Sequence, residues 1–95
     1  MGPDREYQIL VTKHARRSLR RLRKDIDLLT RMDAAIQSLA KHPRPRGSKK
    51  LASKKYGNLY RLRVGAWRIL YAIEDDQLVV LILDIVRRDQ AYRQI

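Results

Sequence analysis

LYRLRVGAWRILY, residues 59–71, is the stretch that decides the fold of this chain. Polar and apolar residues alternate from Tyr60 to Val64, a pattern typical of a half-buried β-strand. Gly65 and Ala66 follow, and a second, largely apolar strand starts at Trp67. A glycine at the first central position of a two-residue connection favours a type II′ turn. The stretch therefore predicts a β-hairpin.

The predicted hairpin concentrates positive charge on one face of the sheet. Its two-residue turn sets Val64 opposite Trp67, and Arg63 opposite Arg68. Arg61 lies two residues from Arg63 and so points to the same face. Like charges directly across a strand pair are destabilising, so we interpret the patch as a binding surface for an anion.

The composition indicates one globular domain over residues 1–95. Apolar residues make up 44% of the chain, and 22 Lys and Arg against 10 Asp and Glu give a net charge of +12. A domain this basic indicates a polyanionic partner, with nucleic acid ranked first, an acidic protein second and an anionic membrane last. No apolar run reaches the ~18 residues needed to span a bilayer, so no membrane partner is expected.

Several classes of site are excluded or disfavoured. The chain has no cysteine, so it has neither disulfides nor thiolate metal ligands. Its carboxylates are few and scattered and no glycine-rich phosphate loop is present, so we expect no metal and no cofactor. The N-terminus is polar with no apolar signal segment after it, and we expect a cytoplasmic protein.

The rest of the chain predicts two helices and further strands. Thr12 suits the N-cap of the first helix, and Pro43 ends the second. The residues from Pro43 to Gly57 are interpreted as a basic loop. The predicted elements are a strand over 7–11, helices from 13 to about 23 and from 25 or 27 to about 41, and strands over 59–64, 67–73 and 78 to about 87. This β-α-α-β-β-β order predicts an α+β fold, a mostly antiparallel sheet with an α-hairpin packed on one face.

The last strand carries four apolar residues on one face, Val79, Leu81, Leu83 and Ile85. Its register is the one in which Trp67, Ile69, Tyr71 and Ile73 share the apolar face of the sheet. A three-residue connection, Asp75–Gln77, places Asp84 across from Arg68 as a salt-bridge partner. Arg88 then joins the arginine face. The helix-covered face in this register consists of Tyr60, Leu62, Val64, Ile69, Tyr71, Leu81 and Leu83.

The arginine face suits RNA better than duplex DNA. Arginine makes bidentate phosphate contacts and keeps its charge, and Tyr92 could stack on an unpaired nucleotide. RNA carries its own nucleophile, the 2′-hydroxyl, so a protein can cleave it by orientation and charge stabilisation alone. His14 and His42 are poorly placed for proton transfer, which leaves Tyr92 by elimination.

Interpretations other than catalysis remain open for several of these residues. Arg61 and Arg63 could form a solvated outer face, and Trp67 is interpreted as core packing. The arginine run of the first helix could be solvated or could contact an acidic partner. The basic loop is either flexible or in contact with RNA through Lys49, Lys50, Lys54 and Lys55.

The hairpin resembles the signature hairpin of the RelE/ParE toxin superfamily. The ending from Leu83 to Arg93, LDIVRRDQAYR, is similar to the last strand and terminal Arg/Tyr motif of that family. The opening from Ile9 to Ala15, the helix pair and the Lys50-Leu51 anchor agree with it. The resemblance covers nearly the whole chain and implies a RelE-like toxin of a type II toxin–antitoxin pair.

In the RelE branch, the resemblance implies a metal-independent endoribonuclease, an mRNA interferase that inhibits translation by cutting mRNA in the ribosomal A site. Arg68 and Arg88 would stabilise the phosphorane, Arg61 and Arg63 would hold the phosphates and favour 2′-hydroxyl deprotonation, and Tyr92 would act as base or acid. Arg87 is assigned to RNA binding with the loop lysines. The implied partners are the ribosome, mRNA and a small acidic RelB-like antitoxin.

The chain departs from the family pattern at both motifs. It has Gly65-Ala66-Trp67-Arg68 where many relatives read Gly-Asp-Tyr-Arg, and Val86-Arg87-Arg88 where many read Gly-His-Arg. Arginine at 61 and 63, often lysine in relatives, weakens a general-base role because arginine does not deprotonate. The alternatives are a ParE-like inhibitor of DNA gyrase and a non-catalytic RNA- or ribosome-binding module.

Overall fold

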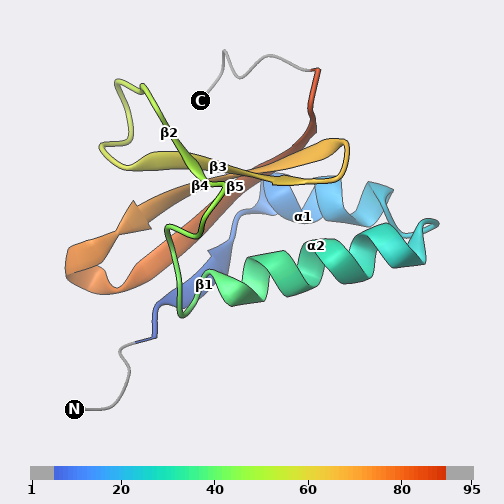
Figure 1. Ribbon diagram of the computed structural model, residues 1–95, viewed down its shortest axis with the longest axis horizontal. Coiled ribbons are helices and arrows are strands. Elements are labelled where there is room, and N and C mark those ends of the chain that lie inside the picture. The colour runs from blue at the N-terminus through green and yellow to red at the C-terminus, as the bar shows by residue number, and fades with distance from the viewer. Residues whose placement is uncertain (1–5, 90–95) are drawn as a thin grey trace.

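The computed structural model describes residues 6–89 as two helices packed on one side of a five-stranded sheet (Figure 1). The elements are β1 (Gln8–Val11), α1 (Lys13–Arg21), α2 (Ile26–Ser38), β2 (Lys49–Leu51), β3 (Leu59–Val64), β4 (Trp67–Glu74), the 3-10 turn η1 (Asp75–Gln77) and β5 (Val79–Arg87). The strand order is β1-β5-β4-β3-β2, with β1 parallel to β5 and the other pairs antiparallel. The predicted α+β fold is confirmed.

α1 begins after the predicted cap Thr12, and α2 begins after Asp25, one of the two starts predicted for it. The Thr12 hydroxyl accepts from the backbone N–H of Ala15 at 3.0 Å, and the Asp25 carboxylate accepts from that of Leu28 at 3.1 Å. The helices end two to three residues earlier than predicted. The chain after Ser38 tightens into shorter-range hydrogen bonds, from Leu39 N–H to the Ile36 carbonyl and from Ala40 N–H to the Gln37 carbonyl.

The hairpin of β3 and β4 has the predicted register, with Val64 paired to Trp67 and Arg63 to Arg68. Gly65 has φ +60°, whereas Ala66 is not among the positive-φ residues. This combination agrees with the predicted type II′ turn, since a type I′ turn needs positive φ at both central residues.

One strand was missed. β2 lies inside the segment predicted as a loop, and it pairs with β3 through Lys49–Arg61 and Leu51–Leu59. It has three residues in a context rich in Pro, Gly and Ser, so its local sequence carries little strand signal. Pairing with β3 and packing of Leu51 form it.

The predicted register of β5 is wrong. Leu78 adopts a left-handed conformation (φ 54°), so β4 and β5 are joined by four residues rather than three. A β-bulge follows, because Tyr71 pairs with Ile82 but Leu70 pairs with Asp84, which leaves Leu83 as the extra residue. Asp84 therefore does not lie across from Arg68, which pairs with Val86 instead.

These shifts exchange the faces of half the strand. The helix side of β5 consists of Val80, Ile82 and Ile85, which join Ile69, Tyr71 and Ile73 in the main core. The prediction that Leu81 and Leu83 face the helices is wrong. Both lie in a second apolar cluster on the opposite face, with Leu59, Leu70 and Ala72 buried there and with Leu51, Tyr56 and Val86 packed around them.

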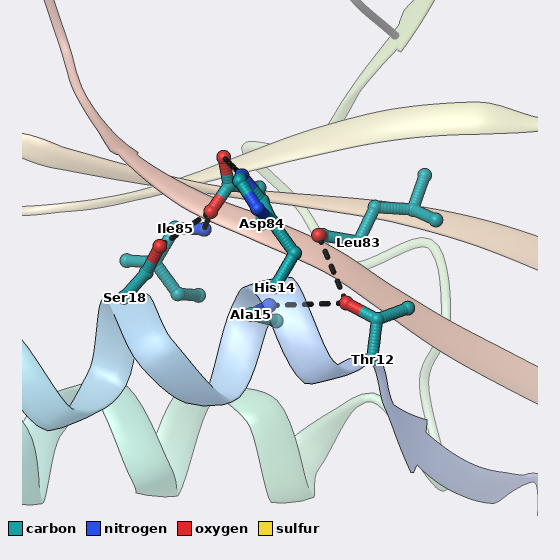
Figure 2. A network of polar contacts seen from close by, with 7 residues as sticks. All are labelled: Thr12, His14, Ala15, Ser18, Leu83, Asp84 and Ile85. Atoms are coloured by element: carbon teal, nitrogen blue, oxygen red, sulfur yellow. Dashed lines mark hydrogen bonds and ion pairs between the residues drawn. The ribbon is translucent and has the colours of Figure 1, made fainter.

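The Asp84 carboxylate fastens α1 to the bulge (Figure 2). Its Oδ1 accepts from the Ser18 hydroxyl at 2.6 Å and from the Ile85 N–H at 2.7 Å, and its Oδ2 lies 3.0 Å from His14 Nε2. The Thr12 hydroxyl donates to the Leu83 carbonyl at 3.1 Å. The first turn and a half of α1 is thus held against two consecutive residues of β5.

A second polar contact holds the far end of the sheet. Arg44 donates to both carboxylate oxygens of Asp75, at 3.2 and 2.8 Å, and Tyr7 donates to the same carboxylate at 2.6 Å. Arg44 also bonds the Tyr60 hydroxyl at 3.1 Å. Hydrogen bonds from Arg44 and Tyr7 lower the pKa of Asp75 to about 2.

We expect Asp84→Ala to lower the free energy of unfolding by about 2 kcal/mol, because the buried Ser18 hydroxyl and the Ile85 N–H lose their acceptor. The matched control is His14→Ala, which touches the same carboxylate from a side chain 70% exposed. It should cost less than about 0.5 kcal/mol. Urea unfolding of the three proteins tests this, and equal losses in both variants would contradict it.

We expect Asp75→Asn to destabilise the protein by less than about 1 kcal/mol at about pH 6, since the paired side chains are 39% and 43% exposed. The folded-state pKa lies below the unfolded-state value, so the contribution is present above about pH 4 and is lost as the pH falls toward 2. The difference between the two proteins should therefore shrink over that range, with Asp76→Asn as control. A constant difference would show that Asp75 acts through another contact.

Candidate functional site

Four arginines from three neighbouring segments share the face of the sheet opposite the helices. Arg61 and Arg63 come from β3, Arg68 from β4, and Arg88 follows β5. The direct pairing of Arg63 with Arg68 was predicted from the turn. Arg88 is held beside the hairpin because its N–H donates to the Ala66 carbonyl at 2.7 Å. We call these four residues the arginine cluster.

The charges of the cluster act on one another. Arg68 is half-buried, whereas Arg63 and Arg88 are exposed. Burial, followed by the positive charges of Arg61, Arg63 and Arg88, lowers the pKa of Arg68. The three neighbours thus lie within electrostatic reach of Arg68, and an anion placed among them would relieve the repulsion.

Arg88 reaches the cluster because of the bulge. Beyond the bulge, Ile85 faces the helices and Val86 the other side, so the next alternation carries Arg87 to the helix side and Arg88 to the cluster. The prediction for Arg88 is correct although its assumed register is wrong. The connection and the bulge each add one residue, and two shifts of one residue restore the original face.

The predicted RNA-binding residues separate into different surfaces. Lys49 pairs with Arg61 and so points to the face of the cluster, whereas Lys50 pairs with Tyr60 on the helix side. Lys54 and Lys55 lie in the turn after β2, with the Lys55 ammonium 5.4 Å from the centre of the Tyr56 ring. Arg87 stacks on Trp67 at 5.6 Å, on the face away from the cluster.

Lys49 is the residue whose placement the sequence did not resolve. Treated as part of a loop, the four lysines were equivalent. Because residues 49–51 form strand β2, Lys49 points to the same face as Arg61, whereas Lys50 points to the helix side. The signal in the sequence was Leu51, an apolar anchor two residues from Lys49, which sets the alternation.

The candidate proton-transfer groups are not among the cluster residues. Tyr92 lies outside the described residues 6–89. His14 is engaged with Asp84 at the start of α1, and His42 is exposed after α2. Within residues 6–89 there is no group of three or more His, Asp or Glu side chains that could hold a metal ion. In the same range no helix is long and apolar enough to cross a membrane.

The arrangement is suited to binding and stabilising a phosphodiester. Guanidinium groups bind phosphate in a bidentate manner and remain charged. They can therefore neutralise charge that develops on phosphate oxygens, whereas the transfer of protons needs another group. A rigid three-stranded support fixes the cluster without any loop rearrangement.

Comparisons with known proteins agree with this fold. The family model described as the ParE toxin of the type II toxin–antitoxin system, parDE, matches residues 9–92. No curated protein matches the chain. Among solved structures, a chain of the toxin–antitoxin complex RelBE2 from Mycobacterium tuberculosis is 31% identical, with a TM-score of 0.71, over 88% of this chain and 94% of that one.

Two further structures show the same architecture. A chain of the archaeal RelE–RelB complex from Pyrococcus horikoshii is 27% identical, with a TM-score of 0.77, over 90% of this chain and 99% of that one. The isolated RelE toxin of E. coli is 16% identical with a TM-score of 0.71, over 92% and 89% of the two chains, and shows likeness of fold alone.

We expect Arg63→Gln to raise the stability of the protein by about 0.5 kcal/mol at low ionic strength, since it removes one of two like charges paired across the hairpin. Inorganic phosphate should stabilise the original protein more than the variant, because the cluster binds the anion in the folded state. Thermal unfolding with and without phosphate measures both effects. The control is Lys54→Gln, and phosphate stabilisation unaffected by Arg63→Gln would place the anion elsewhere.

Proposed function

Since the chain belongs to the ParE toxin family, within the RelE/ParE superfamily of type II toxin–antitoxin toxins, we propose that it is an endoribonuclease that cuts mRNA in the ribosomal A site. The reaction is attack of the 2′-hydroxyl on the adjacent phosphorus, without a metal ion. The observation that supports this proposal is the arginine cluster, which gathers Arg61, Arg63, Arg68 and Arg88 on an open sheet face.

The proposed step is a transesterification within RNA. The 2′-oxygen forms a bond to phosphorus as its proton leaves, and the bond from phosphorus to the 5′-oxygen of the next nucleotide breaks as that oxygen gains a proton. The products are a 2′,3′-cyclic phosphate and a 5′-hydroxyl. Negative charge peaks on the non-bridging oxygens of the phosphorane, which is where fixed guanidinium groups lower the barrier most.

Each arginine has a distinct place in the proposal. Arg68, half-buried and flanked by like charges, and Arg88 beside it would bind the phosphorane oxygens. Arg61 and Arg63 on β3 would hold the phosphates in line and favour ionisation of the 2′-hydroxyl. Tyr92, which belongs to the terminal Arg/Tyr motif of the resemblance, is proposed to act as the base or the acid.

The partners follow from charge. The net charge of +12 favours the ribosome, a large polyanion in the cytoplasm, as the place where mRNA is met. Lys49 would add a phosphate contact beside Arg61, and Lys50, Lys54, Lys55 and Arg87 would contact RNA on other surfaces of the protein. The solved relatives include toxin–antitoxin complexes with RelB, and we propose a small acidic antitoxin of that kind for this chain.

A second candidate is inhibition of DNA gyrase. The observation that favours it is the match of the ParE toxin family model to residues 9–92. This activity needs no nuclease site, so the repulsion among four arginines on one face would then require a different explanation. A basic module that binds RNA without cutting it is the third possibility.

Mapping of 5′ ends tests the proposal. mRNA on programmed ribosomes with an empty A site is incubated with and without the protein, beside the same mRNA alone. New ends within the A-site codon, absent from naked mRNA, are the expected result. Ends on both RNAs would mean a free ribonuclease. No new ends on either would overturn the nuclease function, and gyrase supercoiling would be assayed next.

We expect Arg68→Ala to lower the rate of mRNA cleavage by about 10²–10³-fold, the usual loss on removing one preorganised donor to a developing oxyanion. The affinity for ribosomes should change by only a few-fold, because many other cations remain. Lys41→Ala is the matched control, from an exposed lysine after α2 and outside the cluster. Proportional losses of cleavage and affinity in Arg68→Ala would indicate a binding module instead.

A further inference from the structure

The tip of the β3–β4 hairpin carries an aromatic and a basic side chain that the proposed reaction does not use. Trp67, the first residue of β4, is half-buried against the main core. It pairs with Val64 on one side and with Arg87 on the other. The Arg87 guanidinium lies over the indole ring, 5.6 Å from its centre, and its Nε is 3.8 Å from the Asp89 carboxylate.

A second guanidinium reaches the same tip from the helices. Arg31 lies on α2, and its Nη2 is 3.4 Å from the position that a Cβ on Gly65 would occupy. The Arg31 guanidinium therefore lies against the turn. Arg31 is exposed, and it extends the positive surface from the sheet onto the helix layer.

These groups adjoin the arginine cluster across a thin edge. Val64 and Trp67 are the pair next to Arg63 and Arg68, and the turn between them has two residues. Arg87 and Arg88 are consecutive and point to opposite faces. A chain of phosphates that leaves the cluster at the turn therefore passes from the arginine face to the helix side, where Trp67, Arg31 and Arg87 lie.

We propose that Trp67, with Arg31 and Arg87, stacks a base of single-stranded RNA next to the phosphate held by the arginine cluster. The base extends the existing stack, either on the Arg87 guanidinium or in its place on the indole. Aromatic and guanidinium planes accept any base, since every base has a π-face. The inference deepens the proposed function, because it names unpaired RNA that continues past the cut as the ligand.

Trp67 itself reports on this stacking, because it is the one tryptophan of the chain. The probe is a short single-stranded oligoribonucleotide with 2′-O-methyl sugars throughout, which has no free 2′-hydroxyl and so cannot be cut by the proposed reaction. Stacking of a base should quench the fluorescence of Trp67. An oligomer of the same length with abasic sites should bind through its phosphates with much less quenching. Equal quenching by both oligomers would overturn the proposal.

Variants distinguish the specific contributions of Arg31 and Arg87 from a general effect of positive charge. Arg31→Ala and Arg87→Ala should each weaken binding of the oligonucleotide by about 5–10-fold. Arg87→Ala should also change the fluorescence of Trp67 when no oligonucleotide is present. Arg17→Ala, at an exposed arginine of α1, is the matched control and should change binding by less than about two-fold. Equal weakening in all three variants would mean non-specific charge and would overturn the assignment.

The two hypotheses fail in different ways. Loss of mRNA cleavage in Arg68→Ala with unchanged quenching at Trp67 supports both. Quenching without any cleavage by the original protein would overturn the nuclease and leave the stacking surface in place. Cleavage without quenching would overturn the stacking surface alone.

Discussion

The contact on which this fold depends is the clamp between the Asp84 carboxylate and the start of α1. Asp84 follows the extra residue of the bulge, and Ser18, Ile85 and His14 engage both of its oxygens. The bulge reverses the alternation of β5 halfway along the strand. Before it, Leu83 faces away from the helices, and after it Ile85 faces them. One polar contact thus determines which side chains fill the core and which arginine reaches the cluster.

Both faces of the sheet bury apolar side chains, and this burial stabilises a domain that also contains the polar clamp. The helices cover one face, and Tyr56 and Leu51 cover part of the other over a second apolar cluster. This second cluster lies on the same face as the arginine cluster, with Leu70 paired to Arg61 and Val86 to Arg68. The apolar half anchors the strands firmly enough for the other half to tolerate like charges in contact, which by themselves would weaken the pairing.

The parts of the fold that were predictable are those specified by neighbouring residues. The hairpin register follows from Gly65-Ala66 and the start of the first helix from Thr12, so both were predicted correctly. The start of the second helix was narrowed to Asp25 or Asp27, and Asp25 caps it. The register of β5 was predicted wrongly. A run of consecutive apolar residues has no alternation, and the left-handed position 78 holds a leucine rather than the glycine that usually marks such a conformation. β2 was missed for a related reason, since a three-residue strand exists only through its partner. Three of the four cluster arginines were therefore placed by local rules, and Arg88 was placed correctly through two compensating shifts.

The choice of arginine over lysine in the cluster constrains any chemistry at this site. Arg61 and Arg63 cannot take up a proton in one step and release it in the next, since the guanidinium stays charged throughout. The cluster can therefore supply only binding and charge stabilisation. Any chemistry that moves a proton at this site must depend on a group outside the four arginines.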